Sequence, residues 1–391
     1  MPWFDPNQEE QLAAKAALEK VTLVLERSPS LQVTCVRPVG SWARQTAVTQ
    51  GFDIDVVAFV RRFEGTDVTS LEMWRGDKLT RMRRHVKDQL QAADPSWKVE
   101  VRNDAHYQHV LHVTVGEVEV DLLLAPDCTA GGKVGKMWAS TQHKRLRKPL
   151  LSNPAATVFD LVRHRSDSAA LIEFYIGALA DVLEVMRFVK GLYKYGVQVA
   201  PGCEHIRSLS LEVLVLAAHQ RLRSTKYRRN PKGRAYKMEL LVEFLRLVVA
   251  AVEKREVVML DVSYWCRAVQ PYGYSREVGM QYVHIWGNDP MIVIHPTDFT
   301  CNLERPPEGR AASDWSGLVQ LAERLLARLE RNDVVGFWAE PEVVRAMVHA
   351  VRLRRAIVEG DGHHRRLRQY LGGAAPVKRA RKQSRVLRAV R

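Results

Sequence analysis

The stretch FDIDVVAFV at residues 52–60 sets two aspartates in an apolar run rich in β-branched residues, a composition that predicts a β-strand. Side chains alternate along a strand, so Asp53 and Asp55 share one face while Ile54 points into the core. Two acids side by side can converge on one ligand. They can also serve separately, with one at a strand start and the other capping a turn or making an ion pair.

A third aspartate lies in the later segment GEVEVDLLLAPD at residues 116–127. Asp121 stands there among apolar residues, where a lone carboxylate is costly unless it is paired or bound to a cation. Mg²⁺ prefers oxygen ligands, and two such ions can activate a hydroxyl and stabilise a departing pyrophosphate. Asp53, Asp55 and Asp121 therefore predict a magnesium site, in which Asp121 would also assist deprotonation of an acceptor hydroxyl.

Upstream of these acids, VGSWARQTAV at residues 39–48 has a Gly-Ser pair between a predicted strand and a stretch that could form a short helix. Exposed backbone N–H groups at such a turn can bind phosphate, and Ser41 would add a hydroxyl donor twelve residues before Asp53. A Gly-Ser pair is also common in ordinary turns.

Hydrophobic periodicity divides the chain into an N-terminal α/β lobe and a mostly helical second lobe, with a polar, basic break near residues 127–155. The first lobe is predicted to contain helices at residues 7–27 and 71–92 and strands at 31–39, 52–60, 97–101, 109–115 and 117–124. The second is predicted to contain helices at residues 169–195, 209–223, 237–254, 315–331 and 341–358.

Charge and cysteine content narrow the class of protein. The net charge is +15, and residues 361–391, with ten Lys or Arg and one Asp, supply +9 of it. Such a basic tail and body can attract nucleic acid or an anionic membrane surface. The five cysteines are scattered and form no CxxC pair, no apolar run reaches eighteen residues, and there is no signal-peptide pattern. The sequence therefore predicts a cytoplasmic or nuclear protein without a disulfide framework.

The order of these motifs resembles one family. GSWARQT followed by FDIDVVAFV is similar, without a gap, to GSSGKGT and SDADLVVFL of the 2′-5′-oligoadenylate synthetases, and GEVEVDLLLAPD is similar to their GVEFDVLPAFD. VMRFVKGLYK, RSLSLEVLVLAAHQ and MIVIHPTDFTCNL resemble later motifs of that family in the same order, so the resemblance spans residues 38–302.

The resemblance implies an α+β, bilobal polymerase-β-like nucleotidyltransferase fold, with an N-terminal mixed sheet with helices and a C-terminal helical lobe. The expected division is a catalytic lobe at residues 1–155, a helical lobe at 156–359 and a basic flexible tail at 360–391. The implied activity is template-independent synthesis of 2′-5′-linked oligoadenylates from ATP, activated by double-stranded RNA, in antiviral innate immunity.

The resemblance also implies residue roles. Asp53, Asp55 and Asp121 would hold two Mg²⁺ ions, while Ser41 and Lys190 would contact the phosphates of ATP. A family lysine has no counterpart before residue 208, and Ser208 is its expected substitute. Gln220 falls near the family's adenine contact, although it can equally be a surface glutamine.

Trp42, Ala43 and Arg44 replace the second Ser, the following Gly and the Lys of the family's GSSGK loop, so the loop geometry can differ. Basic residues predicted to contact RNA can alternatively lie on solvated surfaces. They are Arg44, Lys144, Arg145, Arg147, Lys148, Arg187 and Lys194.

Two rival functions share this sequence pattern. A cyclic-dinucleotide synthase of the same superfamily would use the same acids, and an inactive RNA-binding scaffold would have the same fold. Retention of all three acids argues against the scaffold. A monomer is the expected oligomeric state, and PVKRARK in the tail can be a nuclear-import signal or a solvated extension.

Overall fold

A computed structural model of the chain comprises two compact units, Met1–Met347 and Val348–Arg391. The structure describes residues 4–49, 53–74, 77–102, 110–129, 136–153, 170–175, 179–226, 232–265, 267–306 and 310–359. The predicted basic tail at residues 360–391 lies outside the described residues.

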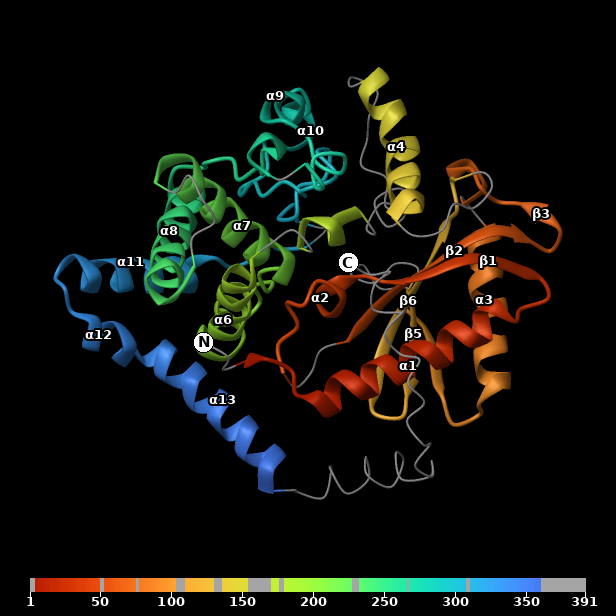
Figure 1. Cartoon of the computed structure of the whole chain (residues 1–391), viewed down its shortest axis with the longest axis horizontal. Helices are drawn as coiled ribbons and strands as arrows, with labels where there is room; N and C mark the ends of the chain where they lie inside the picture. The colour runs from red at the N-terminus through yellow and green to blue at the C-terminus, as the bar shows by residue number, and fades with distance from the viewer. Residues whose placement is uncertain are drawn as a thin grey trace, which may run out of the picture. The chain divides into compact units, whose positions relative to one another are not determined.

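A mixed six-stranded sheet forms the first half of the larger unit (Figure 1). Its order is β1-β2-β6-β5-β4, and the short β3 pairs with β2. β2 and β6 run parallel, whereas the other neighbouring pairs are antiparallel. The strands are β1 (Leu31–Pro38), β2 (Ile54–Phe63), β3 (Thr66–Asp67), β4 (Lys98–Arg102), β5 (Val110–Val115) and β6 (Val118–Pro126).

Helices α1 (Gln8–Glu26) and α3 (Asp77–Ala93) cover one face of this sheet. Their apolar stripes share a core with alternate residues of the strands, such as Ile54 and Val56 of β2 and Val120 of β6. Asn7 begins α1 with a capping box in which its side chain and that of Glu10 bond each other's backbone N–H groups. The core on this face fixes which strand residues point to the opposite face.

The remaining elements of the sheet region are the short helix α2 (Gly40–Ala43), the 3₁₀ turn η2 (Leu71–Trp74) and α4 (Lys136–Ser152). α4 packs on the second face of the sheet, where the rings of Trp138 and Phe59 meet edge to face with centroids 4.4 Å apart. Much of α4 falls in the predicted break at residues 127–155, where no helix was expected.

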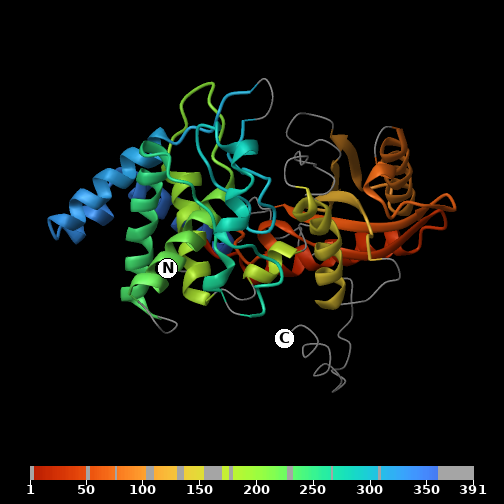
Figure 2. The same ribbon diagram turned by 90° about the horizontal axis from the view of Figure 1, so that it is seen from above.

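The second half of the unit is helical, and α6, α7 and α8 pack against one another while α11 packs on α8 (Figures 1 and 2). A separate cluster of buried aromatic and aliphatic residues consists of side chains between Met259 and Phe299 together with Leu150 of α4. The elements are α6 (Ala180–Gly196), α7 (Ser208–Thr225), α8 (Arg234–Glu253), η4 (Val262–Tyr264), α9 (Arg276–Met280), α10 (Val283–Trp286), α11 (Ser316–Glu330) and α12 (Val334–Ala339). The last helix, α13 (Pro341–Glu359), crosses the boundary of the unit at Met347.

Most predicted elements are confirmed, with shifts of a few residues at their ends. The continuous helix predicted at residues 169–195 is wrong, because Leu179 is extended and α6 begins at Ala180. The strand predicted at residues 52–60 begins at Ile54 and extends to Phe63, and the helix predicted at 71–92 is divided between η2 and α3. Within the described residues, Cys35, Cys128, Cys203 and Cys301 are free thiols. Among the helices that the structure describes, none has both the length and the apolar composition needed to cross a bilayer.

Candidate active site

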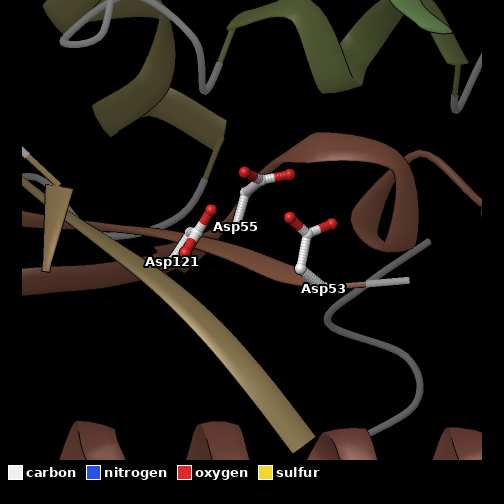
Figure 3. A group of neighbouring side chains, drawn as sticks. All are labelled: Asp53, Asp55 and Asp121. Atoms are coloured by element: carbon white, nitrogen blue, oxygen red, sulfur yellow. The ribbon is translucent and has the colours of Figure 1, made fainter. Parts of the chain in front are cut away.

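The parallel pairing of β2 with β6 brings the predicted acids together. Asp55 and Asp121 are direct partners in this pairing, so their side chains leave the sheet on the same face. Asp53 comes one residue before β2 and two before Asp55. Figure 3 shows the three carboxylates gathered near one another, with Asp53 and Asp55 at the start of β2 and Asp121 within β6.

The geometry of the three carboxylates fits a divalent cation. One oxygen from each lies within 4.8 Å of the others. Burial, and then the negative charge of Asp53, raise the pKa of Asp55 to about 7. Asp121 is only 4% exposed. Gathering three acids at such a site is unfavourable without positive charge, and oxygen-only ligand sets are those that Mg²⁺ prefers.

Gly40 allows the Gly-Ser turn to approach these acids. Its φ is +66°, in the left-handed region, and a Cβ at this position would lie 1.6 Å from Oδ2 of Asp55. The backbone N–H of Val39 donates to the carbonyl of Asp55 at 2.8 Å. Both the backbone conformation and the lack of space therefore require glycine beside Asp55. Ser41 follows on α2, which is the short helix predicted from the sequence, and its side chain is half-buried.

A buried ion cluster joins the segment after α2 to the helices α6 and α7. Glu212 on α7 is fully buried and accepts from Nε of Arg44 and from Nζ of Lys190, each at 2.8 Å. Lys190 also donates to the carbonyl of Thr46, and the Thr46 hydroxyl donates to Glu212, both at 2.8 Å. Glu212 was not among the predicted site residues.

Glu212 and Lys190 differ in how well the cluster stabilises their charged forms. Burial alone would raise the pKa of Glu212, but the charges of Arg44 and then Lys190 lower it to about 2. Burial lowers the pKa of Lys190 in spite of the attraction of Glu212. Both pKa values are lowered, which favours the charged form of Glu212 but the neutral form of Lys190. The reason is that a single carboxylate serves two cations, and Arg44 repels Lys190. We regard the carboxylate as firmly ionised and the ammonium as the less satisfied partner.

This cluster bears on two predicted roles. Lys190 and Arg44 are 6% and 7% exposed, so in this conformation both side chains are used inside the protein. A contact between Lys190 and ATP, or between Arg44 and RNA, would require rearrangement of their bonds to Glu212. Those two roles remain predictions.

Other predicted RNA contacts differ in exposure. Lys144, Arg145 and Lys148 are exposed on α4. Arg147 on the same helix is half-buried, donates to the carbonyl of Gly273 and lies over the ring of Phe299. The structure thus presents to solvent three of the four α4 residues that were predicted to contact RNA.

On α6, Arg187 pairs with Asp5 at 2.6 Å and donates to the carbonyl of Gln45 at 2.7 Å. Lys194 is exposed, and its Nζ lies 5.5 Å from the centroid of the Tyr195 ring. Arg187 is thus held by the N-terminal segment and by the loop after α2, whereas Lys194 is exposed.

The two remaining nucleotide-contact predictions fall on α7. Ser208 is exposed at the first position of the helix. Gln220 is half-buried, and its Oε1 accepts from the backbone N–H of Asp261 at 3.0 Å and from the indole N–H of Trp265 at 3.3 Å. Gln220 therefore fixes the start of η4, and its proposed adenine contact remains a prediction.

His112 is a further residue at the acidic site that the sequence did not single out. It lies on β5 directly opposite Asp121, and its Nδ1 is 2.8 Å from Oδ1 of Asp121. Its side chain is buried. The signal that could have located it is the two-residue Gly116-Glu117 turn, since the pairing of Val115 with Val118 across that turn sets His112 opposite Asp121.

Comparison with known proteins supports the fold. No protein-family model matches this sequence, and no curated protein matches it. The solved structure of CdnC from E. coli MS115-1 in a complex with HORMA-deltaN is similar, with a TM-score of 0.50 and 15% identity over 90% of this chain and 92% of that chain.

A structure of Cid1, whose title refers to RNA terminal uridylyl transferase activity, has a TM-score of 0.50 at 13% identity, covering 84% of this chain and 90% of that chain. At these identities the likeness concerns the fold alone. It confirms the predicted α+β fold of polymerase-β-like nucleotidyltransferases.

Proposed function

We propose that the chain is a template-independent nucleotidyltransferase that joins ATP into 2′-5′-linked oligoadenylates and releases pyrophosphate. The observation that carries this proposal is the convergence of Asp53, Asp55 and Asp121 within 4.8 Å of one another beside the turn at Gly40 and Ser41. The ATP substrate and the 2′-5′ linkage rest on the sequence resemblance to the oligoadenylate synthetases.

In the proposed reaction, a ribose hydroxyl attacks the α-phosphorus of ATP, a new P–O bond forms, and the bond to the leaving pyrophosphate breaks. Two Mg²⁺ ions held by the three aspartates would supply positive charge to the triphosphate and lower the pKa of the attacking hydroxyl. The Asp121 carboxylate accepts the hydroxyl proton, and Ser41 donates to a phosphate oxygen. Gly40 keeps the phosphate-binding turn against Asp55.

We further propose that double-stranded RNA activates the enzyme by docking on exposed basic side chains, including Lys144, Arg145 and Lys148 of α4 and Lys194 of α6. Double-stranded RNA is recognised largely through its backbone and 2′-hydroxyl groups, so a basic surface suffices without a sequence code. The proposed enzyme acts as a monomer.

The decisive assay incubates the purified protein with Mg²⁺ and labelled ATP, or all four NTPs, with and without double-stranded RNA, and resolves the products by chromatography. Linear 2′-5′ oligomers that form faster with RNA support the proposal. A cyclic dinucleotide would instead establish the rival synthase, and extension of the added RNA would establish terminal transfer. Equal rates with and without RNA would exclude RNA activation.

A further inference from the structure

His112 lies beside Asp121, the third carboxylate of the acidic site, where it can orient that side chain. It stands on β5 between Leu111 and Val113, whose side chains enter the core on the opposite face of the sheet. His112 is 5% exposed, and the antiparallel pairing with β6 places its Cα directly opposite that of Asp121. Its side chain therefore shares a face with the three acids.

The chemistry of the bond fixes its direction. An ionised carboxylate can only accept hydrogen bonds, so the Nδ1 of His112, 2.8 Å from Oδ1 of Asp121, carries the proton and donates it. The other ring nitrogen, Nε2, lies 3.9 Å from Oε1 of Glu119, whose side chain is 61% exposed. The bond to Asp121 is thus the close, buried one that sets the orientation of the ring.

An aspartate carboxylate is otherwise loosely held in rotation, because the torsion about its Cβ–Cγ bond has broad minima. A buried donor aimed at Oδ1 restricts that rotation. The bond from His112 therefore holds the Asp121 carboxylate in a defined orientation on the face where the three acids meet.

We infer that His112 is a positioning residue that orients Asp121 for magnesium binding in the active site. The inference rests on the proposed function for its catalytic meaning, but its direct consequence concerns metal affinity. Partners that hydrogen-bond metal-binding carboxylates and histidines typically contribute about 10- to 100-fold to metal affinity or activity.

Two substitutions separate positioning from packing. In His112→Asn the side-chain amide nitrogen occupies about the place of Nδ1 and can still donate to Asp121. In His112→Gln the amide nitrogen corresponds to Nε2, so the polar character is kept while the donor is displaced. His219→Leu is a matched control, because His219 is also buried, at 4% exposure, and bonds another side chain, that of Tyr236, far along the chain from the acids.

The experiment measures Mn²⁺ binding to each purified, folded variant by the loss of the free-ion EPR signal, followed by the Mg²⁺ dependence of ATP consumption. His112→Gln should weaken Mn²⁺ binding about 10- to 100-fold, His112→Asn should restore it to within a few-fold of wild type, and His219→Leu should leave it unchanged. Equal Mn²⁺ affinity of wild type and His112→Gln would overturn the inference.

The design separates this inference from the proposed function. A wild-type protein that binds Mn²⁺ and shows the Gln-against-Asn difference, yet transfers no nucleotide, would uphold the role of His112 and refute the enzymatic proposal. A wild-type protein that binds no Mn²⁺ would refute both.

Discussion

At the scale of single residues, a comparison of Gly40 with Gly116 distinguishes the cost of backbone strain from the cost of a steric clash. Their φ angles are +66° and +65°, but a Cβ on Gly116 meets nothing within 4 Å, whereas a Cβ on Gly40 would collide with Asp55. Both substitutions to alanine cost the energy of a left-handed conformation, about 1–2 kcal/mol. Only Gly40→Ala must also displace a metal-binding carboxylate.

We therefore expect Gly116→Ala to lower the free energy of unfolding by about 1–2 kcal/mol and to keep full activity. Gly40→Ala should be less stable than Gly116→Ala and should lose at least about 100-fold in nucleotide transfer, more than loss of a supporting hydrogen bond to a metal ligand. Urea denaturation and the ATP assay measure the two effects. Full activity in Gly40→Ala would show that the turn does not need to lie against Asp55.

Asp55 gives a prediction that depends on pH. Its pKa is raised from 3.8 to about 7 in the folded, metal-free protein, chiefly by burial and then by Asp53. A carboxyl with a higher pKa in the folded state favours folding when protonated, so the metal-free protein should lose stability as the pH rises from about 4 to about 7. The loss from this group is on the order of a few kcal/mol.

Asp55→Asn should remove this pH-dependent loss, so the metal-free variant should melt at a higher temperature than wild type at pH 8 and should transfer nucleotide at least about 100-fold more slowly. Thermal melts in EDTA between pH 4 and 8 measure the first effect. Wild type and variant with identical pH profiles would contradict the repulsion among the three acids.

The acids could be predicted from sequence because alternation along one strand places Asp53 and Asp55 on one face, and an acid in an apolar strand demands a partner. His112 and Glu212 were not predicted. The role of His112 depends on the register of β5 against β6, which can be read only once the Gly116-Glu117 turn is recognised as a hairpin turn. That of Glu212 depends on contacts with Arg44 and Lys190, 168 and 22 residues away in sequence, which produce no local pattern.

At the scale of elements, the segment after α2 is tied to α6 and α7 by one carboxylate. Glu212→Gln would leave Arg44 and Lys190 buried without a compensating charge, and breaking such a buried pair costs about 3–5 kcal/mol. The exposed pair of Lys15 and Glu19, 3.9 Å apart, is a suitable reference, because exposed pairs contribute at most about 1 kcal/mol.

Urea denaturation should therefore show a loss of about 3–5 kcal/mol for Glu212→Gln and at most about 1 kcal/mol for Glu19→Gln. The large loss should be insensitive to salt, because the cluster is buried. Similar midpoints for the two variants would mean that the cluster does not hold these elements together.

The helix α4 shows why an element can escape prediction. Trp138, Leu146 and Leu150 lie on its buried side at helical spacing, but the polar Gln142 and His143 interrupt this stripe. Gln142 is buried because it accepts from the backbone N–H of Cys128 and donates to the carbonyl of Pro126. Its place in the stripe follows from tertiary bonds that hydrophobic periodicity does not detect.

At the scale of the whole molecule, the fold was predictable because several ordered motifs agree with one another, and the lobe limits at residues 155 and 359 stay predictions. Contacts divide the chain at Met347, within α13, rather than where the composition changes. The sequence pattern reports hydrophobic periodicity, but a compact unit is defined by long-range packing.

The last prediction at this scale concerns RNA binding, because two separate basic regions carry positive charge that attracts RNA. Residues 361–391 carry +9 of the net charge of +15, and α4 exposes Lys144, Arg145 and Lys148. Each neutralised phosphate releases a counterion, so affinity for double-stranded RNA falls with salt in proportion to the number of contacts. The tail should contribute affinity without specificity, whereas α4 should contribute to activation.

A chain ending at Glu359 should therefore bind double-stranded RNA more weakly and with a shallower dependence on salt, yet keep RNA-stimulated transfer at saturating RNA. Changing Lys144, Arg145 and Lys148 together to glutamine should lower the salt slope by up to about 3 and reduce the stimulation itself. Fluorescence anisotropy between 50 and 200 mM salt measures binding, and the ATP assay measures stimulation. If the truncated chain alone lost stimulation while the α4 variant kept it, the RNA-activating surface would have to be assigned to the tail.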